Sequence, residues 1–319
     1  MKIQKTLFIA ATAMLSLCAC SSDDTSTNSE DQKSQIYVTI DELEFEDDFG
    51  ATRSYLSRDM KTHMWVELDS MRVYDNILQK YDMYKFNWKD ETHNAGVFGR
   101  TNNPSNIQEA KWALFPHRDV ASGHWDMDEE TFINYTTAWI RICCDKNGNV
   151  VPLKFSQIED GQPLFADRLP RWGQVTATDN GSKLYTNLSY LTAVLRLQLA
   201  GTQGKADHLK VQMLQGDTPL PIAGQYKTHL AINDVKQVAA LSVENYMPNE
   251  GGGTAIIVDL TGATGSIVAY VPLVTTSVPV DIVVSASNDG GQTYTEFKRF
   301  KNKIVTRGKV YGNANEYVF

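Results

Sequence analysis

One short run near the N-terminus has the residue types and spacing for a covalent modification. Leu17-Cys18-Ala19-Cys20 places a leucine three positions before a cysteine and a small residue directly before it. This is the lipobox pattern, in which the chain is cut before the cysteine and the thiol becomes thioether-linked to diacylglycerol. We therefore expect Cys20 to be the lipidated first residue of the mature protein, with palmitate among the acyl chains of its anchor.

The residues on either side of this box fit an exported lipoprotein. Lys2 and Lys5 precede an apolar stretch that is too short for a membrane span, which needs roughly 20 apolar residues. Residues 1–19 are therefore predicted to be a lipoprotein signal peptide. The chain after the cysteine contains no apolar side chain up to residue 34, so we expect residues 20–34 to form a disordered tether.

Two acidic residues close to the lipidated cysteine bear on where the protein is displayed. Asp23 and Asp24 resemble the surface-export signal of Bacteroidetes lipoproteins. The resemblance implies a surface-exposed lipoprotein of the cell outer membrane. Retention on the periplasmic side of that membrane is the alternative.

The remaining sequence contains no pattern that would carry enzyme chemistry. A Gly-rich phosphate loop, a Cys-x-x-Cys pair, a Gly-x-Ser-x-Gly elbow and a His-Glu-x-x-His pair are all missing. His117 and His124 lie among acidic residues, but their separation fits no ligand spacing. Asp145–Asn149 mimics part of a calcium loop, yet its glycine comes early and no glutamate closes it, so a turn is favoured. The sequence predicts a protein that is not an enzyme and holds no metal or cofactor.

Charge and cysteine usage narrow the class further. The chain has 30 basic and 38 acidic residues, a net charge of −8, and loss of Lys2 and Lys5 with the signal peptide makes it −10. Such a protein lacks the basic footprint of non-specific nucleic-acid binding. Cys143 and Cys144 are neighbours, and neighbours in a strand point to opposite faces. We expect one buried and one partly exposed thiol and no disulfide between them.

Short β-type runs separated by turn residues dominate the chain after the tether. Asn288–Gly291 is the clearest hairpin turn, because it joins two such runs and contains two adjacent glycines. Helix is sparse, with residues 74–82 and 230–241 as short candidates. The pattern predicts an all-β protein built from β-sandwiches. The expected strands are 36–40, 64–68, 71–74, 135–144, 150–155, 191–199, 208–214, 255–260, 266–271, 278–286, 292–298, 304–311 and 316–319.

Loop-like composition near residues 170–183, including Leu169–Gly173, suggests a domain boundary. We place an N-terminal β-sandwich domain at residues 35–178 and a C-terminal β-sandwich domain at 179–319. Several tryptophans fall in the first domain, where they serve either the core or an exposed sugar-binding platform, and the core is favoured. They are Trp88, Trp112, Trp125, Trp139 and Trp172.

Several motifs together resemble the fimbrillin family, the lipoprotein pilins of Bacteroidales. The resemblance spans nearly the whole mature chain, although each motif is loose on its own, and Leu68-Asp69 stands where the family more often has Gly-Asp. The motifs are Ala51-Thr52-Arg53-Ser54, the Trp65 strand ending in Asp69–Tyr74, Trp112–Pro116, Leu191–Leu197 and Arg307–Tyr311.

The resemblance implies two β-sandwich domains of transthyretin-like topology and assembly by strand exchange into a surface fimbrium, or pilus, that supports cell adhesion. The removable strand would be Gln35–Phe45, with Ile36, Val38 and Ile40 on one face. An Arg-specific protease would cut after it, and the candidate sites are Arg53 and Arg58. The candidate donor strand for the next subunit contains Val310, Tyr311, Tyr317, Val318 and Phe319. The implied partners are other pilin subunits and a host or bacterial surface ligand.

Alternatives stay open for each of these assignments. The chain would be a shaft or tip subunit, or an anchor subunit that keeps its lipid. It would otherwise be a surface glycan-binding lipoprotein of a nutrient-uptake system. The arginines would then be ordinary loop residues, and the C-terminal segment would be the last strand of its own sandwich.

Overall fold

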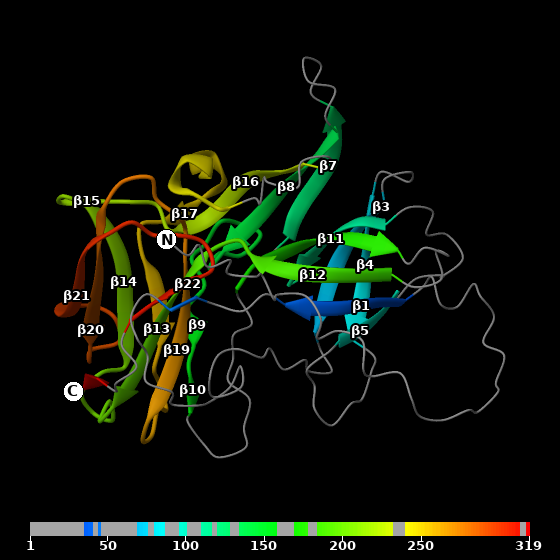
Figure 1. Cartoon of the computed structure of the whole chain (residues 1–319). Helices are drawn as coiled ribbons and strands as arrows, with labels where there is room; N and C mark the ends of the chain where they lie inside the picture. The colour runs from blue at the N-terminus through cyan, green and yellow to red at the C-terminus, as the bar shows by residue number, and fades with distance from the viewer. Residues whose placement is uncertain are drawn as a thin grey trace, which may run out of the picture.

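The structure is a computed structural model of the whole chain, and it is built almost entirely of β-strands (Figure 1). This confirms the all-β class. Two short 3-10 helices, η3 (Val243–Asn245) and η4 (Pro248–Glu250), are the helical elements among the described residues. The structure describes residues 35–40, 44–45, 69–75, 80–86, 96–100, 110–116, 120–127, 134–157, 169–177, 184–231, 240–312 and 317–319.

The first part of the fold is a sheet that closes on itself, because its last strand pairs with its first. We call it the closed sheet. Its inner face holds an apolar cluster to which most of its strands contribute. In order around the sheet, the strands are β1 (Gln35–Ile40), β12 (Leu184–Tyr190), β11 (Arg171–Ala177), β6 (Ala110–Phe115), β3 (Ser70–Asp75), β4 (Lys80–Phe86) and β5 (Gly96–Arg100).

The second part is a sandwich of two sheets formed mostly by the C-terminal half, with the largest apolar cluster between them (Figure 1). One sheet has the order β10 (Ser156–Gln157), β19 (Ile267–Leu273), β13 (Ala193–Ala200), β22 (Lys309–Tyr311) and β2 (Glu44–Phe45), with β23 (Tyr317–Val318) also on β13. The other has the order β21 (Thr295–Lys303), β20 (Val280–Ser287), β14 (His208–Gln215), β18 (Ile256–Asp259) and β9 (Leu153–Lys154), with β15 (Thr218–Pro219) on β14.

A third sheet joins the two parts. Trp112 and Trp172 on the outer face of the closed sheet belong to the same buried cluster as Ile140 of this third sheet. Their rings lie 5.2 Å apart, so the core assignment of these two tryptophans is confirmed. The third sheet has the order β17 (Gly252–Gly253), β16 (Ala223–Ala231), β8 (Asn134–Ile142) and β7 (Val120–Met127).

The sandwich strands follow the alternation that the sequence predicts. In β13, Leu195, Leu197 and Leu199 are fully buried, while Arg196 and Gln198 between them are partly exposed. Strands β20 and β21 form the expected antiparallel hairpin, whose turn includes Gly290 at φ 74°. Such positive φ values are unstrained only for glycine.

The N-terminal half differs from the sandwich that the sequence predicts, because its sheet closes. The predicted boundary between residues 178 and 179 falls between β11 and β12, which pair with each other in the closed sheet. Separate folding of residues 35–178 and 179–319 stays a prediction. The transthyretin-like topology also stays a prediction.

Three local expectations are wrong. Residues 74–82 are not a helix, because Tyr74 in β3 pairs with Tyr81 in β4. Residues 169–173 are not a surface loop, because β11 begins at Arg171 and pairs on both sides, with β6 and β12. Cys143 and Cys144 are both buried, and neither forms a disulfide.

The second helix candidate, residues 230–241, is only partly described. Its first two residues end strand β16, and residues 232–239 lie outside the described residues. The Asp145 turn is described in full, and the backbone N–H groups of Asn147 and Asn149 donate to its carboxylate at 2.7 and 2.9 Å. This confirms the turn.

Candidate functional site

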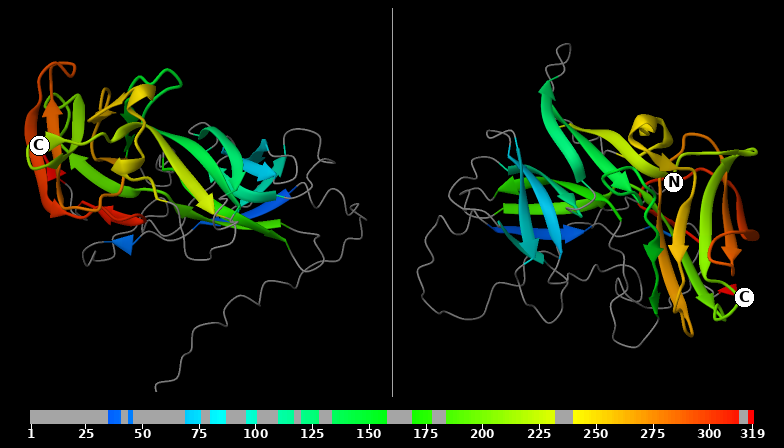
Figure 2. Two further views of the ribbon diagram at one scale, coloured as in Figure 1. Left: turned by 90° about the horizontal axis from the view of Figure 1, so that it is seen from above. Right: turned by 180° about the vertical axis from the view of Figure 1, so that it is seen from behind.

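β1, the first described strand, is an internal strand of the closed sheet, with a neighbouring strand on each side (Figure 2). β1 runs parallel to β12, from Ile36 opposite Leu184 to Ile40 opposite Leu188, and antiparallel to β5. The removable strand implied by the resemblance is thus not an edge strand, because both edges of β1 are hydrogen-bonded. Removing β1 would therefore open the closed sheet and leave two unpaired edges, on β5 and on β12.

The inner face of β1 fills the core of the closed sheet. Ile36 is 0% exposed and Val38 is 1% exposed. Both belong to the buried cluster that contains Met71, Phe98 and Leu188. Full burial of an aliphatic side chain stabilises the fold by roughly 1.5–3 kcal/mol. The apolar part of this strand is thus strongly held, although only a few residues are involved.

The outer face of β1 carries an aromatic pair that the sequence did not single out. Tyr37 stacks on Tyr185 of β12, with ring centroids 5.2 Å apart, and Tyr185 is 40% exposed. Next to this pair, the Thr39 hydroxyl donates to the Asn187 side chain at 2.9 Å. Cross-strand pairs of this kind stabilise a sheet by roughly 0.2–1 kcal/mol each.

The N-terminal segment also reaches the sandwich. β2 pairs in parallel with β22, with Glu44 opposite Lys309 and Phe45 opposite Val310. The two blue strands therefore lie in different parts of the molecule (Figure 2). Ile40 at the end of β1 packs against a buried cluster that lies between those parts, and we call it the junction cluster. Its members are Leu169, Tyr190, Val194, Val268, Tyr270 and Val310.

The C-terminal segment belongs to one sheet of the sandwich, where β22 lies between β13 and β2. Val310 and Tyr311 are buried, and the Tyr311 hydroxyl donates to the Ile304 carbonyl oxygen at 2.7 Å. β22 and β23 both pair in parallel with β13. Within this chain, the candidate donor segment is thus the last strand of its own sandwich.

The end of this segment is held more loosely than its beginning. Tyr317 and Phe319 pack on Phe297 with ring centroids 6.1 and 4.3 Å away, while Val318 between them is 73% exposed. Among the described residues, β23 pairs with β13 through Tyr317 and Val318, and the Phe319 N–H donates to the Ala200 carbonyl oxygen at 3.2 Å. Few ladder contacts therefore hold the last residues in place.

Three of the predicted site residues cannot be placed. Cys20, Arg53 and Arg58 lie outside the described residues. His117 and the side chain of His124 lie outside them too.

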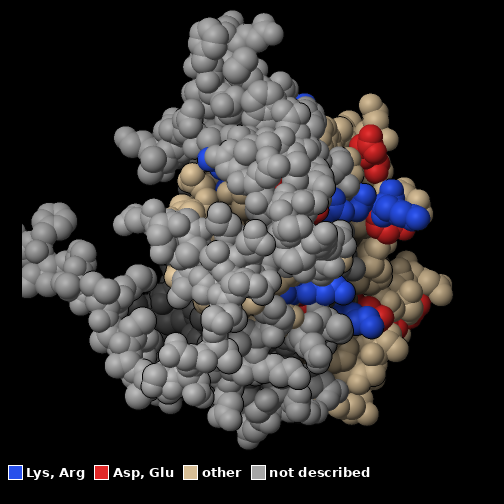
Figure 3. Space-filling view, turned by 90° about the vertical axis from the view of Figure 1, so that its right-hand side faces the viewer, with Lys and Arg blue, Asp and Glu red and all other residues tan. Residues whose placement is uncertain are grey.

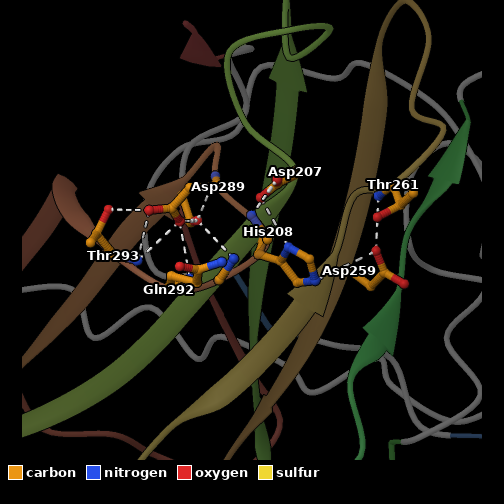
Figure 4. Close-up of polar contacts among 10 residues, drawn as sticks. Asp207, His208, Asp259, Thr261, Asp289, Gln292 and Thr293 are labelled. Atoms are coloured by element: carbon orange, nitrogen blue, oxygen red, sulfur yellow. Dashed lines mark hydrogen bonds and ion pairs between the residues drawn. The ribbon is translucent and has the colours of Figure 1, made fainter.

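A polar cluster at one end of the sandwich is the clearest group of titratable residues that the structure describes (Figure 4). The His208 ring donates from Nδ1 to the Asp207 carboxylate at 2.9 Å, and its Nε2 lies 3.9 Å from the Asp259 carboxylate. The His208 ring and the backbone N–H of Gly290 hold the pKa of the Asp207 carboxyl below its usual range. The cluster thus ties the β20–β21 turn to the start of β14.

This cluster lacks the arrangement of a hydrolase. The Ser287 hydroxyl donates to the Asp289 carboxylate at 2.8 Å and not to the His208 ring. The Thr293 hydroxyl and backbone N–H also donate to Asp289 and hold its pKa far below the usual range. The carboxylate is therefore engaged in closing the turn, and no activated nucleophile forms here.

The described residues contain neither a metal site nor a membrane-spanning helix. Within the described ranges, no group of His, Cys, Asp and Glu side chains is arranged to hold a metal ion. The same residues include no helix long and apolar enough to cross a membrane. On the side of the closed sheet, several of the described basic side chains lie beside acidic ones (Figure 3).

Comparison with known proteins adds a distant likeness in shape. No protein-family model matches the chain, and no curated protein matches it in sequence. Among solved structures, a candidate cell adhesion protein of Bacteroides ovatus is 13% identical, with 89% of this chain and 90% of that chain covered and a TM-score of 0.38.

Two fimbrial proteins of Porphyromonas gingivalis are also similar. The fimbrial anchor protein Mfa2 is 10% identical, with 84% of this chain and 81% of that chain covered and a TM-score of 0.25. The tip fimbrial protein Mfa3 is 10% identical, with 82% and 80% covered and a TM-score of 0.24. At these values, none of the three structures assigns a family or a function to the chain.

Proposed function

We propose that the chain is a structural subunit, shaft or tip, of a surface fimbrium that assembles by strand exchange and supports adhesion. The observation that carries this proposal is the position of β1. A short strand at the start of the described chain completes the closed sheet, buries Ile36 and Val38, and precedes the segment that contains Arg53 and Arg58. One cut in that segment would turn β1 from part of the chain into a bound peptide.

Loss of that peptide would create a receptor for another strand. β5 and β12 would present unpaired N–H and C=O groups, and the space left by Ile36 and Val38 would be apolar. An incoming strand would pair the exposed backbone groups and fill the apolar space at once, because its backbone completes the hydrogen-bonded ladder and its alternate side chains enter the core. Such a strand binds by β-strand addition, which depends on backbone hydrogen bonds and does not need a catalytic site.

The C-terminal segment is the source of that strand in this proposal. Its last residues pair with β13 over a short length, and Tyr317 and Phe319 share one face, as Ile36 and Val38 do. Release from β13 costs few hydrogen bonds. The segment would then extend to the closed sheet of a neighbouring subunit.

The lipid on Cys20 would be a delivery device in this scheme. It would hold the precursor at the outer membrane until cleavage, and the mature shaft or tip subunit would leave it behind with β1. An anchor subunit would keep it. The N-terminus of the mature protein, acylated Cys20 or a new end after an arginine, separates the two positions.

The test replaces both arginines in the expressing bacterium. Arg53→Ala with Arg58→Ala should abolish the new N-terminus and the heat-resistant ladders of cell-envelope protein on denaturing gels. Arg53→Lys with Arg58→Lys is the matched control, because it keeps the charge and removes only the arginine that the protease requires, and it should fail in the same way. Normal fibres from either double variant would refute the proposal.

A further inference from the structure

A buried arginine stands where the closed sheet meets the sandwich. Arg171 begins β11, and its neighbours in the sheet are Phe115 of β6 and Tyr190 of β12. The side chain is 0% exposed. β1 and β12 end at this junction and β11 begins there, on the side of the closed sheet that faces the sandwich (Figure 1).

The guanidinium group of Arg171 has too few partners for a buried cation. Nη2 donates to the Tyr190 hydroxyl at 3.3 Å, and the group lies over the Phe115 and Tyr190 rings, 5.3 and 4.6 Å from their centroids. Nε and Nη1 are buried and have no hydrogen-bond partner among the residues that the structure describes. None of the described carboxylates forms an ion pair with it.

Burial of the charged Arg171 guanidinium lowers the stability of the folded protein unless an anion binds to it. A guanidinium keeps its charge in proteins and cannot avoid the penalty by losing a proton. The effective penalty of burying an ion is several kcal/mol, whereas each cation–π contact returns roughly 0.5–2 kcal/mol. The ring contacts occupy the faces of the planar group and leave the Nε and Nη1 donors at its edges for a carboxylate.

The residues around Arg171 add a second positive charge, and the departure of β1 would give a ligand access to the site. Arg307 donates from Nη1 to the Tyr190 carbonyl oxygen at 3.1 Å, so a second guanidinium lies on the same strand end. Ile40, the last residue of β1, packs on the junction cluster that includes Tyr190. Departure of β1 would therefore uncover this region, and a strand in its place that ran slightly further would reach Tyr190.

We propose that Arg171 and Tyr190 form a carboxylate-binding site at the junction. The ligand is a carboxylate from a strand that lies along β12. The source favoured by the geometry is a strand of a second copy that replaces β1, and this source rests on the function proposed above. The carboxylate-binding site itself does not rest on that function, because it follows from the buried guanidinium of Arg171 and its unpaired donors.

The first experiment tests the site on the full chain with sodium formate as the probe. Formate should raise the thermal unfolding midpoint of the wild-type protein by a few degrees over sodium chloride of equal ionic strength, because a ligand that binds only the folded state stabilises it. Arg171→Met should remove this response. Arg171→Lys, which keeps the charge and loses the planar donors, should weaken it.

Arg299→Met is the matched control, because Arg299 already has carboxylate partners in Asp281 and Glu296. It should respond to formate as the wild type does. An equal formate response in the wild type and Arg171→Lys overturns the site, and so does the absence of any response in the wild type. Arg171→Lys keeps the test decisive if Arg171→Met does not fold.

The second experiment identifies the source with the full chain cut by an arginine-specific protease. A peptide of residues 309–319 should bind more tightly than the same peptide with Glu316→Gln and a C-terminal amide, and Arg171→Lys should reduce the difference. Equal binding of both peptides to the wild type overturns the second copy as the source. If neither peptide binds, strand exchange is refuted. The formate experiment then still tests the carboxylate-binding site at Arg171.

Discussion

Ile36 should set how long β1 stays bound after the chain is cut. The side chain is fully buried in the closed sheet, so Ile36→Ala removes contacts and leaves a cavity. Comparable truncations cost about 2–5 kcal/mol. Since about 1.4 kcal/mol is a factor of ten, release of the cut strand should become faster by a factor on the order of 30 to several thousand.

The assay follows the cut fragment over time. The purified chain is cleaved with an arginine-specific protease, and the N-terminal fragment that leaves the protein is measured by mass spectrometry after gel filtration. Thr39→Ala is the control, because Thr39 lies on the outer face of the same strand and loses one cross-strand contact of roughly 0.2–1 kcal/mol, so release should change by about fivefold at most. Equal release from the two variants would show that burial of Ile36 does not hold the strand.

Two further predictions concern residues outside the closed sheet. Gly148→Ala should destabilise the protein by more than about 1 kcal/mol in chemical denaturation, because φ is +80° and the new Cβ would lie 2.2 Å from the Glu250 carbonyl oxygen. Gly204→Ala has a similar φ of +71° with open space around it, and it should cost less. Asp207→Asn should lower stability at neutral pH, because the His208 ring holds the pKa of the Asp207 carboxyl below its usual value of 3.8. A depressed carboxyl pKa stabilises the fold above the unfolded value and loses this effect as the pH falls through the folded value, so denaturation curves of wild type and variant should converge below about pH 4. A stability difference that persisted at lower pH would contradict this.

The sequence predicted secondary structure best at positions where the local residue pattern and the tertiary contacts favour the same element. The alternation around Leu195 and Leu197 predicts a half-buried strand, and the paired glycines at 290–291 predict a hairpin turn, because both depend on neighbouring residues alone. Tyr74 was misplaced because its pairing with Tyr81 comes from cross-strand burial, which a helical reading of the same residues ignores.

The candidate site was less predictable, because its pairing is long-range. β1 was identified as an apolar strand, but nothing near residue 36 reveals that its partners are Leu184 and Phe98. Arg171 lies in a run with proline and glycine that is typical of a loop, and only pairing with β6 and β12 makes it a buried strand residue. Its unpaired guanidinium is visible only in three dimensions.

The double pairing of β1 has a mechanical consequence. A pull on the chain from its N-terminal side acts along the axis of β1, which is hydrogen-bonded to β5 on one edge and to β12 on the other. Such a force loads the bonds of both ladders in shear, so they resist together and do not open one after another. β1 should therefore resist mechanical extension of the chain, and a tether attached to it would hold the protein against drag for as long as the strand remains in the sheet.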